Sequence, residues 1–170
     1  MVPYRLESRL FLPAPLPDVF TFFADTRNLG AITPPFLRFT VLTPDIVMRQ
    51  GARIDYRLRL RGLPMRWQSE ITAWEPNVRF KDEQRRGPYT YWRHVHLFRE
   101  EHGGTLVEDG VEYEVPGGHL VHEWIVAPEL VRIFRYRQQA LARIFGEDPR
   151  QVAKVVIVKL LLNGSARLRA

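Results

Sequence analysis

Residues 87–98 read GPYTYWRHVHLF, and after a Gly103-Gly104 turn residues 105–115 read TLVEDGVEYEV. Both segments alternate in polarity, which predicts two strands of an antiparallel hairpin, because successive side chains of a strand point to opposite faces. One face of the first strand is predicted to carry Trp92, His94, His96 and Phe98. The same face of the second strand is predicted to carry Val107, Asp109, Val111 and Tyr113.

Polar groups are therefore expected on an otherwise apolar face of this hairpin. A turn centred between Glu101 and His102 would set His94 opposite Asp109 and His96 opposite Val107. Buried polar groups need hydrogen-bond partners. A sheet that points two imidazoles, an indole and a carboxylate inward is thus predicted to border a cavity, water or a ligand.

The composition limits the class of protein. At 170 residues the chain has the length of one domain, and 45% hydrophobic with 26% charged residues argues against disorder. Because there is no cysteine, disulfides, thiolate metal ligands and a cysteine nucleophile are excluded. The first residues lack a signal-peptide pattern, and no apolar run approaches the roughly 20 residues of a membrane-spanning helix. We expect a cytoplasmic protein without an integral membrane segment.

The formal charge of +6 is unevenly distributed. Residues 149–170 hold five basic residues and no acid, so the rest of the chain is close to neutral. Arg53, Arg57, Arg59 and Arg61 alternate with other residues, which is typical of the solvated face of a strand. We therefore expect no nucleic-acid partner.

The predicted elements follow one order along the chain. They are a strand over 4–12, short helices over 18–25 and 26–32, strands over 36–43, 52–61, 65–74 and 78–84, the hairpin, and a helix over 119–145. Pro128 should kink or restart the long helix. The wide apolar stripe of that helix belongs against the concave face of a sheet. This order predicts an α+β fold in which a curved antiparallel sheet of about seven strands wraps around a long C-terminal helix.

Short motifs from about Tyr4 to Phe145 accompany this order. They are Asn28-Leu29, Thr33-Pro34-Pro35-Phe36, Met48, Gly51, Ile54-Asp55-Tyr56-Arg57-Leu58, Trp67, Phe80, Asp82, Gln84, Gly87-Pro88-Tyr89, Trp92, His94, His96, Phe98, Gly104-Thr105, Asp109, Val111, Tyr113, Ile133-Phe134 and Tyr136-Arg137. With them the chain resembles the START, or Bet v 1-like, helix-grip (SRPBCC) superfamily. That superfamily includes START lipid-transfer domains, the birch-pollen allergen family and aromatic polyketide cyclases. The similarity is greater to a bacterial branch of cyclase-like or ligand-binding proteins, some of them described as cell-division inhibitors.

Three functions are compatible with this resemblance. The favoured one is binding of a small hydrophobic or aromatic molecule in a cavity between sheet and C-terminal helix. The predicted ligand-binding residues are Tyr56, Trp67, Asp82, Gln84, Trp92, His94, His96, Asp109, Tyr113 and Phe134. The second is a polyketide cyclase or dehydrase in which Asp109 orients His94 for acid–base catalysis. The third is a non-enzymatic regulator that docks a protein partner.

A metal ion is a further option for the two histidines. His94 and His96 lie two apart on one strand face and could share an ion, with Asp109 or Asp82 as third ligand. The remaining histidines extend no ligand pattern, and the superfamily branch is not known for metalloproteins. We therefore expect no metal and no other cofactor.

The chain is predicted to divide near residue 148. Residues 1–148 are expected to form the helix-grip ligand-binding domain, and residues 149–170 a basic, apolar extension. The extension could add an edge strand, dock as a helix, mediate self-association as a homodimer or contact an anionic membrane surface.

Overall fold

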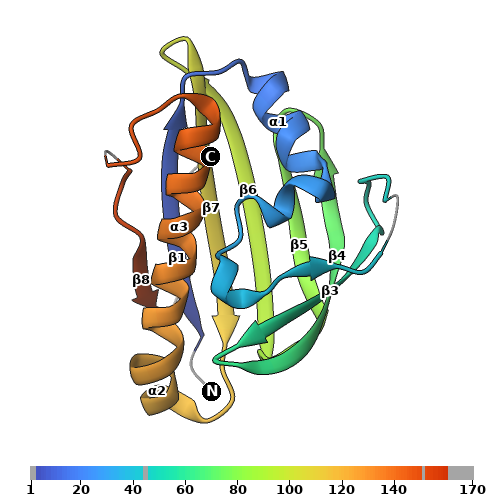
Figure 1. The fold of residues 1–170 in the computed structure, drawn as a ribbon, viewed down its shortest axis with the longest axis vertical. Helices are drawn as coiled ribbons and strands as arrows, with labels where there is room; N and C mark the ends of the chain where they lie inside the picture. The colour runs from blue at the N-terminus through green and yellow to red at the C-terminus, as the bar shows by residue number, and fades with distance from the viewer. Residues whose placement is uncertain (1–2, 44–45, 151, 161–170) are drawn as a thin grey trace.

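The structure is a computed structural model that describes residues 3–43, 46–150 and 152–160. Its strands are β1 (Tyr4–Leu12), β2 (Thr40–Val41), β3 (Arg53–Leu60), β4 (Leu63–Glu75), β5 (Arg79–Arg86), β6 (Tyr91–Glu101), β7 (Gly104–Glu114) and β8 (Val156–Lys159). They form one antiparallel sheet in the order β2-β3-β4-β5-β6-β7-β1-β8. A long helix lies across the inner face of this sheet (Figure 1). The predicted α+β helix-grip architecture is confirmed.

The first strand lies next to the edge of the sheet that is farther from β2. Residues of β1 alternate between buried and more exposed positions, and Leu6 and Leu12 are fully buried. This alternation allows β1 to pair with β7 on one side, with Leu6 opposite Val111. On its other side β1 pairs with β8, which is an eighth strand supplied by the extension. The proposed division near residue 148 stays a prediction, and residues 161–170 lie outside the described part of the chain.

Short helices follow β1, as predicted. They are α1 (Leu16–Ala24) and the 3-10 helices η1 (Thr26–Gly30) and η2 (Pro35–Leu37). Pro17 lies in the first turn of α1, where a missing N–H costs nothing, and the helix buries Val19, Phe20 and Phe23. The predicted strand over 36–43 is wrong in extent. Pro34 and Pro35 begin a 3-10 turn, Arg38 then takes a left-handed conformation with φ of 44°, and only Thr40–Val41 pairs as a strand.

The long helical segment has three parts. These are α2 (Gly118–Val121), a π-helical turn η3 (His122–Val126) and α3 (Ala127–Phe145). Pro128 lies in the first turn of α3, where its missing backbone N–H costs little, so the predicted restart is confirmed. Gln138 of α3 donates from Nε2 to Ser8 Oγ at 2.9 Å and to the Arg9 carbonyl at 3.1 Å. These bonds join the middle of α3 to β1.

The β6–β7 hairpin differs from prediction by one residue in its turn. His102 and Gly103 both have positive φ, at 47° and 79°, and Glu101 pairs with Gly104. Two central residues of positive φ suit a tight hairpin turn, because its twist matches that of the strands. The turn therefore centres between His102 and Gly103. Asp109 lies opposite His96 instead of His94, and His94 lies opposite Val111.

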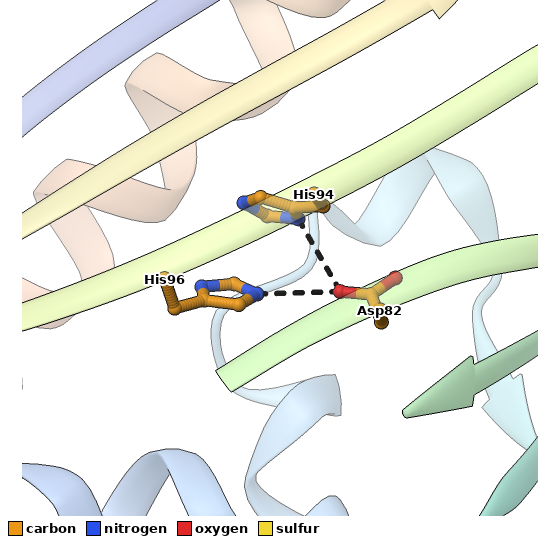
Figure 2. A group of neighbouring side chains, drawn as sticks. All are labelled: Asp82, His94 and His96. Atoms are coloured by element: carbon orange, nitrogen blue, oxygen red, sulfur yellow. Dashed lines mark ion pairs between the residues drawn. The ribbon is translucent and has the colours of Figure 1, made fainter. Parts of the chain in front are cut away.

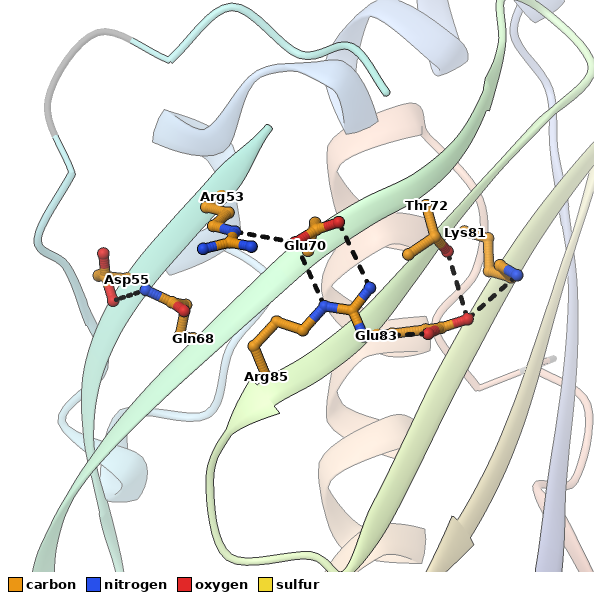
Figure 3. Close-up of polar contacts among 8 residues, drawn as sticks. All are labelled: Arg53, Asp55, Gln68, Glu70, Thr72, Lys81, Glu83 and Arg85. Carbon is orange, nitrogen blue, oxygen red and sulfur yellow. Dashed lines mark hydrogen bonds and ion pairs between the residues drawn. The ribbon is translucent and has the colours of Figure 1, made fainter. Parts of the chain in front are cut away.

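The outer face of β3, β4 and β5 carries charged side chains, as the alternation predicts (Figure 3). Arg53 contacts Glu70 at 2.8 Å, and Arg85 contacts the same carboxylate at 3.2 Å. Lys81 contacts Glu83 at 3.1 Å. Such exposed pairs contribute roughly 0–1 kcal/mol each, so this face favours solubility more than stability. None of the helices in the described residues is long and apolar enough to cross a bilayer.

Candidate functional site

A cavity of about 220 Å³ lies between the inner face of the sheet and α3. Seven of the ten predicted ligand-binding residues line it: Tyr56, Trp67, Asp82, Trp92, His94, His96 and Phe134. The period of two residues along β3 to β6 turns the first six inward, and the helical face of α3 supplies Phe134. The segment after α1 closes another wall with Leu29, Ile32 and Leu37.

One carboxylate lies behind both inward histidines. His94 and His96 are 7% and 4% exposed, and Asp109 on the neighbouring strand β7 is 6% exposed. Asp109 Oδ1 lies 3.0 Å from His94 Nε2 and 2.7 Å from His96 Nδ1. The first contact is a hydrogen bond, whereas the angle at His96 Nδ1 is poor for one. A single oxygen atom thus faces both rings.

A second carboxylate lies on the opposite side of the two rings. The β5–β6 register sets Asp82 opposite His94. Asp82 Oδ2 lies 3.7 Å from His94 Nδ1 and 3.4 Å from His96 Nε2 (Figure 2). The Ser69 hydroxyl donates to Asp82 Oδ1 at 3.3 Å, and Trp67 Nε1 donates to Ser69 Oγ at 3.1 Å. The two imidazoles are therefore held between two carboxylates.

The protonation states of this cluster follow from burial, from the guanidinium of Arg137 and from the contacts between the carboxylates and the imidazoles. Burial by itself raises the pKa of Asp109, but Arg137 and the two imidazoles outweigh it and hold that pKa well below its usual value. Burial acts in the same way on Asp82, where His96 and His94 outweigh it and lower the pKa. For His94, burial and then His96 lower the pKa despite both acids. Both carboxylates are thus ionised at neutral pH and His94 is neutral.

Three predicted ligand-binding residues do not line the cavity. Asp109 lies behind the histidines, as described above. Gln84 is near the end of β5, where its Nε2 donates to the Tyr89 carbonyl at 2.7 Å. It fastens the turn before β6, from which Pro88 and Tyr89 reach the cavity. Tyr113 is fully buried beneath the π-helical turn, where its hydroxyl contacts His122 Nε2 at 2.9 Å.

Two polar residues that contact the cluster of carboxylates and histidines, Arg137 and Ser69, have no role in the sequence-based prediction. Arg137 Nε lies 3.7 Å from Asp109 Oδ2, and Arg137 lines the cavity. Its position three residues after Phe134 places it on the same helix face, a signal that was present in the sequence. Ser69 shares the inward face of β4 with Trp67. A serine in an alternating strand gives no such signal.

His122 should make the stability of the fold depend on pH. The ring stacks on Tyr4 at 3.4 Å between centroids, and burial and then His119 lower the pKa of His122. The unfolded chain takes up a proton near the ordinary value of about 6.5, before the folded chain does, so stability falls as pH drops below that value. We expect a smaller fall in Tm between pH 7.5 and 5.5 for His122→Phe than for wild type.

The exposed turn residue His102 provides the control for this measurement. His102→Asn keeps a residue that tolerates the left-handed conformation and should retain the full wild-type fall in Tm. Identical pH profiles for wild type and His122→Phe would show that His122 titrates alike in the folded and unfolded chains.

Asp82, His94 and His96 also form a group that could hold a metal ion. In the described part of the chain, each of these three residues offers one potential ligand atom, and these three atoms lie within 4.8 Å of one another. Two imidazole nitrogens and one carboxylate oxygen are a donor set used for zinc and non-haem iron. All three residues line the cavity.

Comparison with known proteins identifies the family. The family model for polyketide cyclase/dehydrase and lipid transport matches residues 12–142. The chain belongs to this family. No curated protein matches the chain.

Solved structures share the fold of this family member at low sequence identity. A protein from Chromobacterium violaceum is 16% identical, with a TM-score of 0.68 over 85% of this chain and 98% of that one. The major latex-like protein 151 from Panax ginseng is 11% identical, with a TM-score of 0.65 over 85% and 99% of the two chains. Ara h 8.0201 is 13% identical, with a TM-score of 0.60 over 83% and 99%. These likenesses confirm the Bet v 1-like helix-grip fold predicted from the sequence.

Proposed function

We propose that the protein binds a small hydrophobic or aromatic molecule in the cavity between the sheet and α3. The observation that carries the proposal is the cavity itself, which has aromatic walls and one polar end. Trp67 and Trp92 lie edge to face with ring centroids 5.2 Å apart and provide apolar contact. Asp82, His94 and His96 provide the polar end. Ligand pockets commonly combine an apolar lining with a few such placed polar groups.

The size of the cavity narrows the ligand class. An apolar cavity of about 150 Å³ holds benzene, and pockets for drug-sized ligands span about 300–1,000 Å³. A volume of about 220 Å³ lies between these values. It suits a molecule of one or two rings, and is too small to enclose a long acyl chain. The polar end favours a ligand that carries a hydroxyl or carbonyl group.

A cavity-filling substitution tests this proposal, with 1-naphthol as the probe. Leu58 is 9% exposed and lines the cavity, so Leu58→Trp should fill part of the space. We expect calorimetric titration to show saturable 1:1 binding to wild type and at least roughly tenfold weaker binding to Leu58→Trp. The tenfold estimate follows from the loss of apolar contact between the probe and the cavity, which is worth a few kcal/mol.

Leu97 supplies the matched control. It lies on β6 with its side chain 38% exposed on the other face of the sheet, so Leu97→Trp should bind the probe as wild type does. Equal affinity in both variants, or no saturable binding to wild type, would refute binding of this ligand class in the cavity.

Acid–base catalysis is the second candidate, as in a cyclase or dehydrase. The hydrogen bond from His94 to Asp109 supports it, and His94 lines the cavity. The geometry favours binding, because Nε2 of His94 faces Asp109 and Nδ1 faces Asp82. Each ring nitrogen of His94 therefore faces a carboxylate, and neither faces only the cavity. Unchanged turnover of a bound candidate substrate by His94→Ala would eliminate the catalytic candidate.

The remaining inferences concern partners and location. The cavity argues against a regulator whose core is filled by side chains. Pairing of Arg53 and Arg85 with Glu70 on the outer sheet face supports the absence of a nucleic-acid partner. The edge strand β8 is a surface through which a homodimer could form. A cytoplasmic location remains our inference from the sequence.

A further inference from the structure

We propose that Asp82, His94 and His96 bind a divalent transition-metal ion at the polar end of the cavity, with Asp109 orienting both imidazoles from behind. The sequence argues against a metal site because the remaining histidines extend no ligand pattern, and it leaves open whether Asp109 or Asp82 faces both histidines. The structure supplies that information through the β5–β6 register, which sets Asp82 opposite His94. The proposal concerns the polar end of the same cavity, but its test needs no organic ligand, so metal binding and binding of a hydrophobic molecule can fail separately.

The distances between the ligand atoms suit an ion between them. Asp82 Oδ2 is 3.4 Å from His96 Nε2 and 3.7 Å from His94 Nδ1, both longer than a typical hydrogen bond. Zinc bonds of about 2.0–2.1 Å in tetrahedral geometry place neighbouring ligand atoms roughly 3.3 Å apart. The two distances to Asp82 are therefore close to those around a common ion, and all three ligand atoms lie within 4.8 Å of one another (Figure 2).

Asp109 provides to His94 the outer hydrogen bond that a metal-bound histidine usually has, and to His96 a close contact without hydrogen-bond geometry. A ligating imidazole commonly donates its second N–H to a carboxylate, which fixes the ring and its tautomer. Here Asp109 Oδ1 faces the second nitrogen of each ring, Nε2 of His94 and Nδ1 of His96. With these nitrogens protonated, His94 Nδ1 and His96 Nε2 present lone pairs toward Asp82. Three acceptors then lie within 4.8 Å of one another, and a cation bound among them would satisfy all three.

The local charge also favours a cation. The cluster contains two carboxylates, and Arg137 is the guanidinium that contacts one of them. Two carboxylates against one contacting guanidinium leave an excess of acidic groups at this site, and buried charge is costly without compensation. A divalent ion removes that excess. Imidazole and carboxylate donors together suit zinc or ferrous iron, and three protein ligands leave coordination positions open toward the cavity.

Cobalt(II) titration tests the site without a tag or an organic ligand. Wild-type protein is freed of metal with a chelator and titrated with Co²⁺, with visible absorption as the readout and Zn²⁺ as competitor. We expect 1:1 binding that Zn²⁺ displaces. Asp82→Asn should weaken binding at least roughly tenfold, and Asp109→Asn by about 10–100-fold through lost orientation of the imidazoles. His102→Asn, outside the cluster, should bind as wild type does.

Two results would overturn the proposal. One is wild-type protein that binds neither Co²⁺ nor Zn²⁺ stoichiometrically, which would mean that a proton satisfies the cluster. The other is 1:1 binding that persists in folded His94→Gln/His96→Gln protein, which would place the ion elsewhere. Anomalous scattering from wild-type crystals soaked in Zn²⁺ gives a check that does not depend on how any variant folds. A peak between the three side chains supports the site, and a peak only elsewhere refutes it.

Discussion

Replacing Asp109 with alanine is expected to lower the free energy of unfolding by about 3–5 kcal/mol, the typical cost of removing one partner of a buried charge cluster. The substitution leaves Arg137, whose side chain is 13% exposed, without its carboxylate. It also removes the oxygen that faces His94 Nε2 and His96 Nδ1. Urea denaturation of metal-free protein at neutral pH measures the loss.

Glu108 offers a matched control on the same strand. Its carboxylate points to the outer face and contacts Arg9 and Arg99, each at 2.8 Å, and both arginines are more than 60% exposed. Exposed pairs of this kind contribute about 0.2–1 kcal/mol, so Glu108→Ala should cost far less than Asp109→Ala. Equal losses in the two variants would show that Asp109 is not a buried partner of Arg137. Asp109→Leu/Arg137→Met should recover much of the stability, because apolar groups can replace a buried ion pair.

These measurements separate two roles of the same residues. A purely structural network of Asp109, His94 and His96 predicts the stability loss and no metal binding. A metal site predicts the stability loss together with a change in Co²⁺ affinity for Asp109→Asn. The same distinction applies to Asp82, which lines the cavity and has 17% of its side chain exposed, against 6% for Asp109. Its substitution by asparagine should affect metal affinity more than stability.

The inward face of the hairpin could be predicted from the sequence because it depends only on a period of two residues. The predicted turn was one residue too early, which moved the partner of Asp109 from His94 to His96. Moving the turn by one residue shifts the cross-strand pairing by two residues. Because the side chains of a strand alternate with a period of two, every side chain stays on its own face of the sheet. The cluster of His94, His96 and Asp109 therefore survived an incorrect register, with His94 reaching Asp109 diagonally.

Other features of the site depend on contacts that alternation does not encode. The position of Asp82 opposite His94 depends on how the turn before β6 sets the β5–β6 register. Gln84 shares the parity of Asp82, yet it lies near the strand end and bonds to Tyr89. Tyr113 also points inward, but the π-helical turn covers it with His122. The alternation along each strand thus predicted which face of the sheet each side chain occupies, whereas tertiary packing determined which of the inward side chains reach the cavity.

Replacing Trp92 with alanine is expected to lower the free energy of unfolding by about 3–5 kcal/mol, as for other buried tryptophans. Trp92 is 8% exposed and packs against Trp67 and Tyr89, at 5.2 Å and 4.7 Å between ring centroids. Its loss joins new empty volume to the existing cavity, and the rings around it lose their contacts. Denaturation in urea measures the change.

Trp124 provides the same substitution in a different environment. It lies in the π-helical turn with 76% of its side chain exposed, so Trp124→Ala should change stability by no more than about 0.5 kcal/mol. A loss for Trp92→Ala that matches this small value would mean that the cavity wall collapses without cost. Such collapse would contradict a rigid pocket, because a wall that closes over a missing indole would equally close over an empty ligand site.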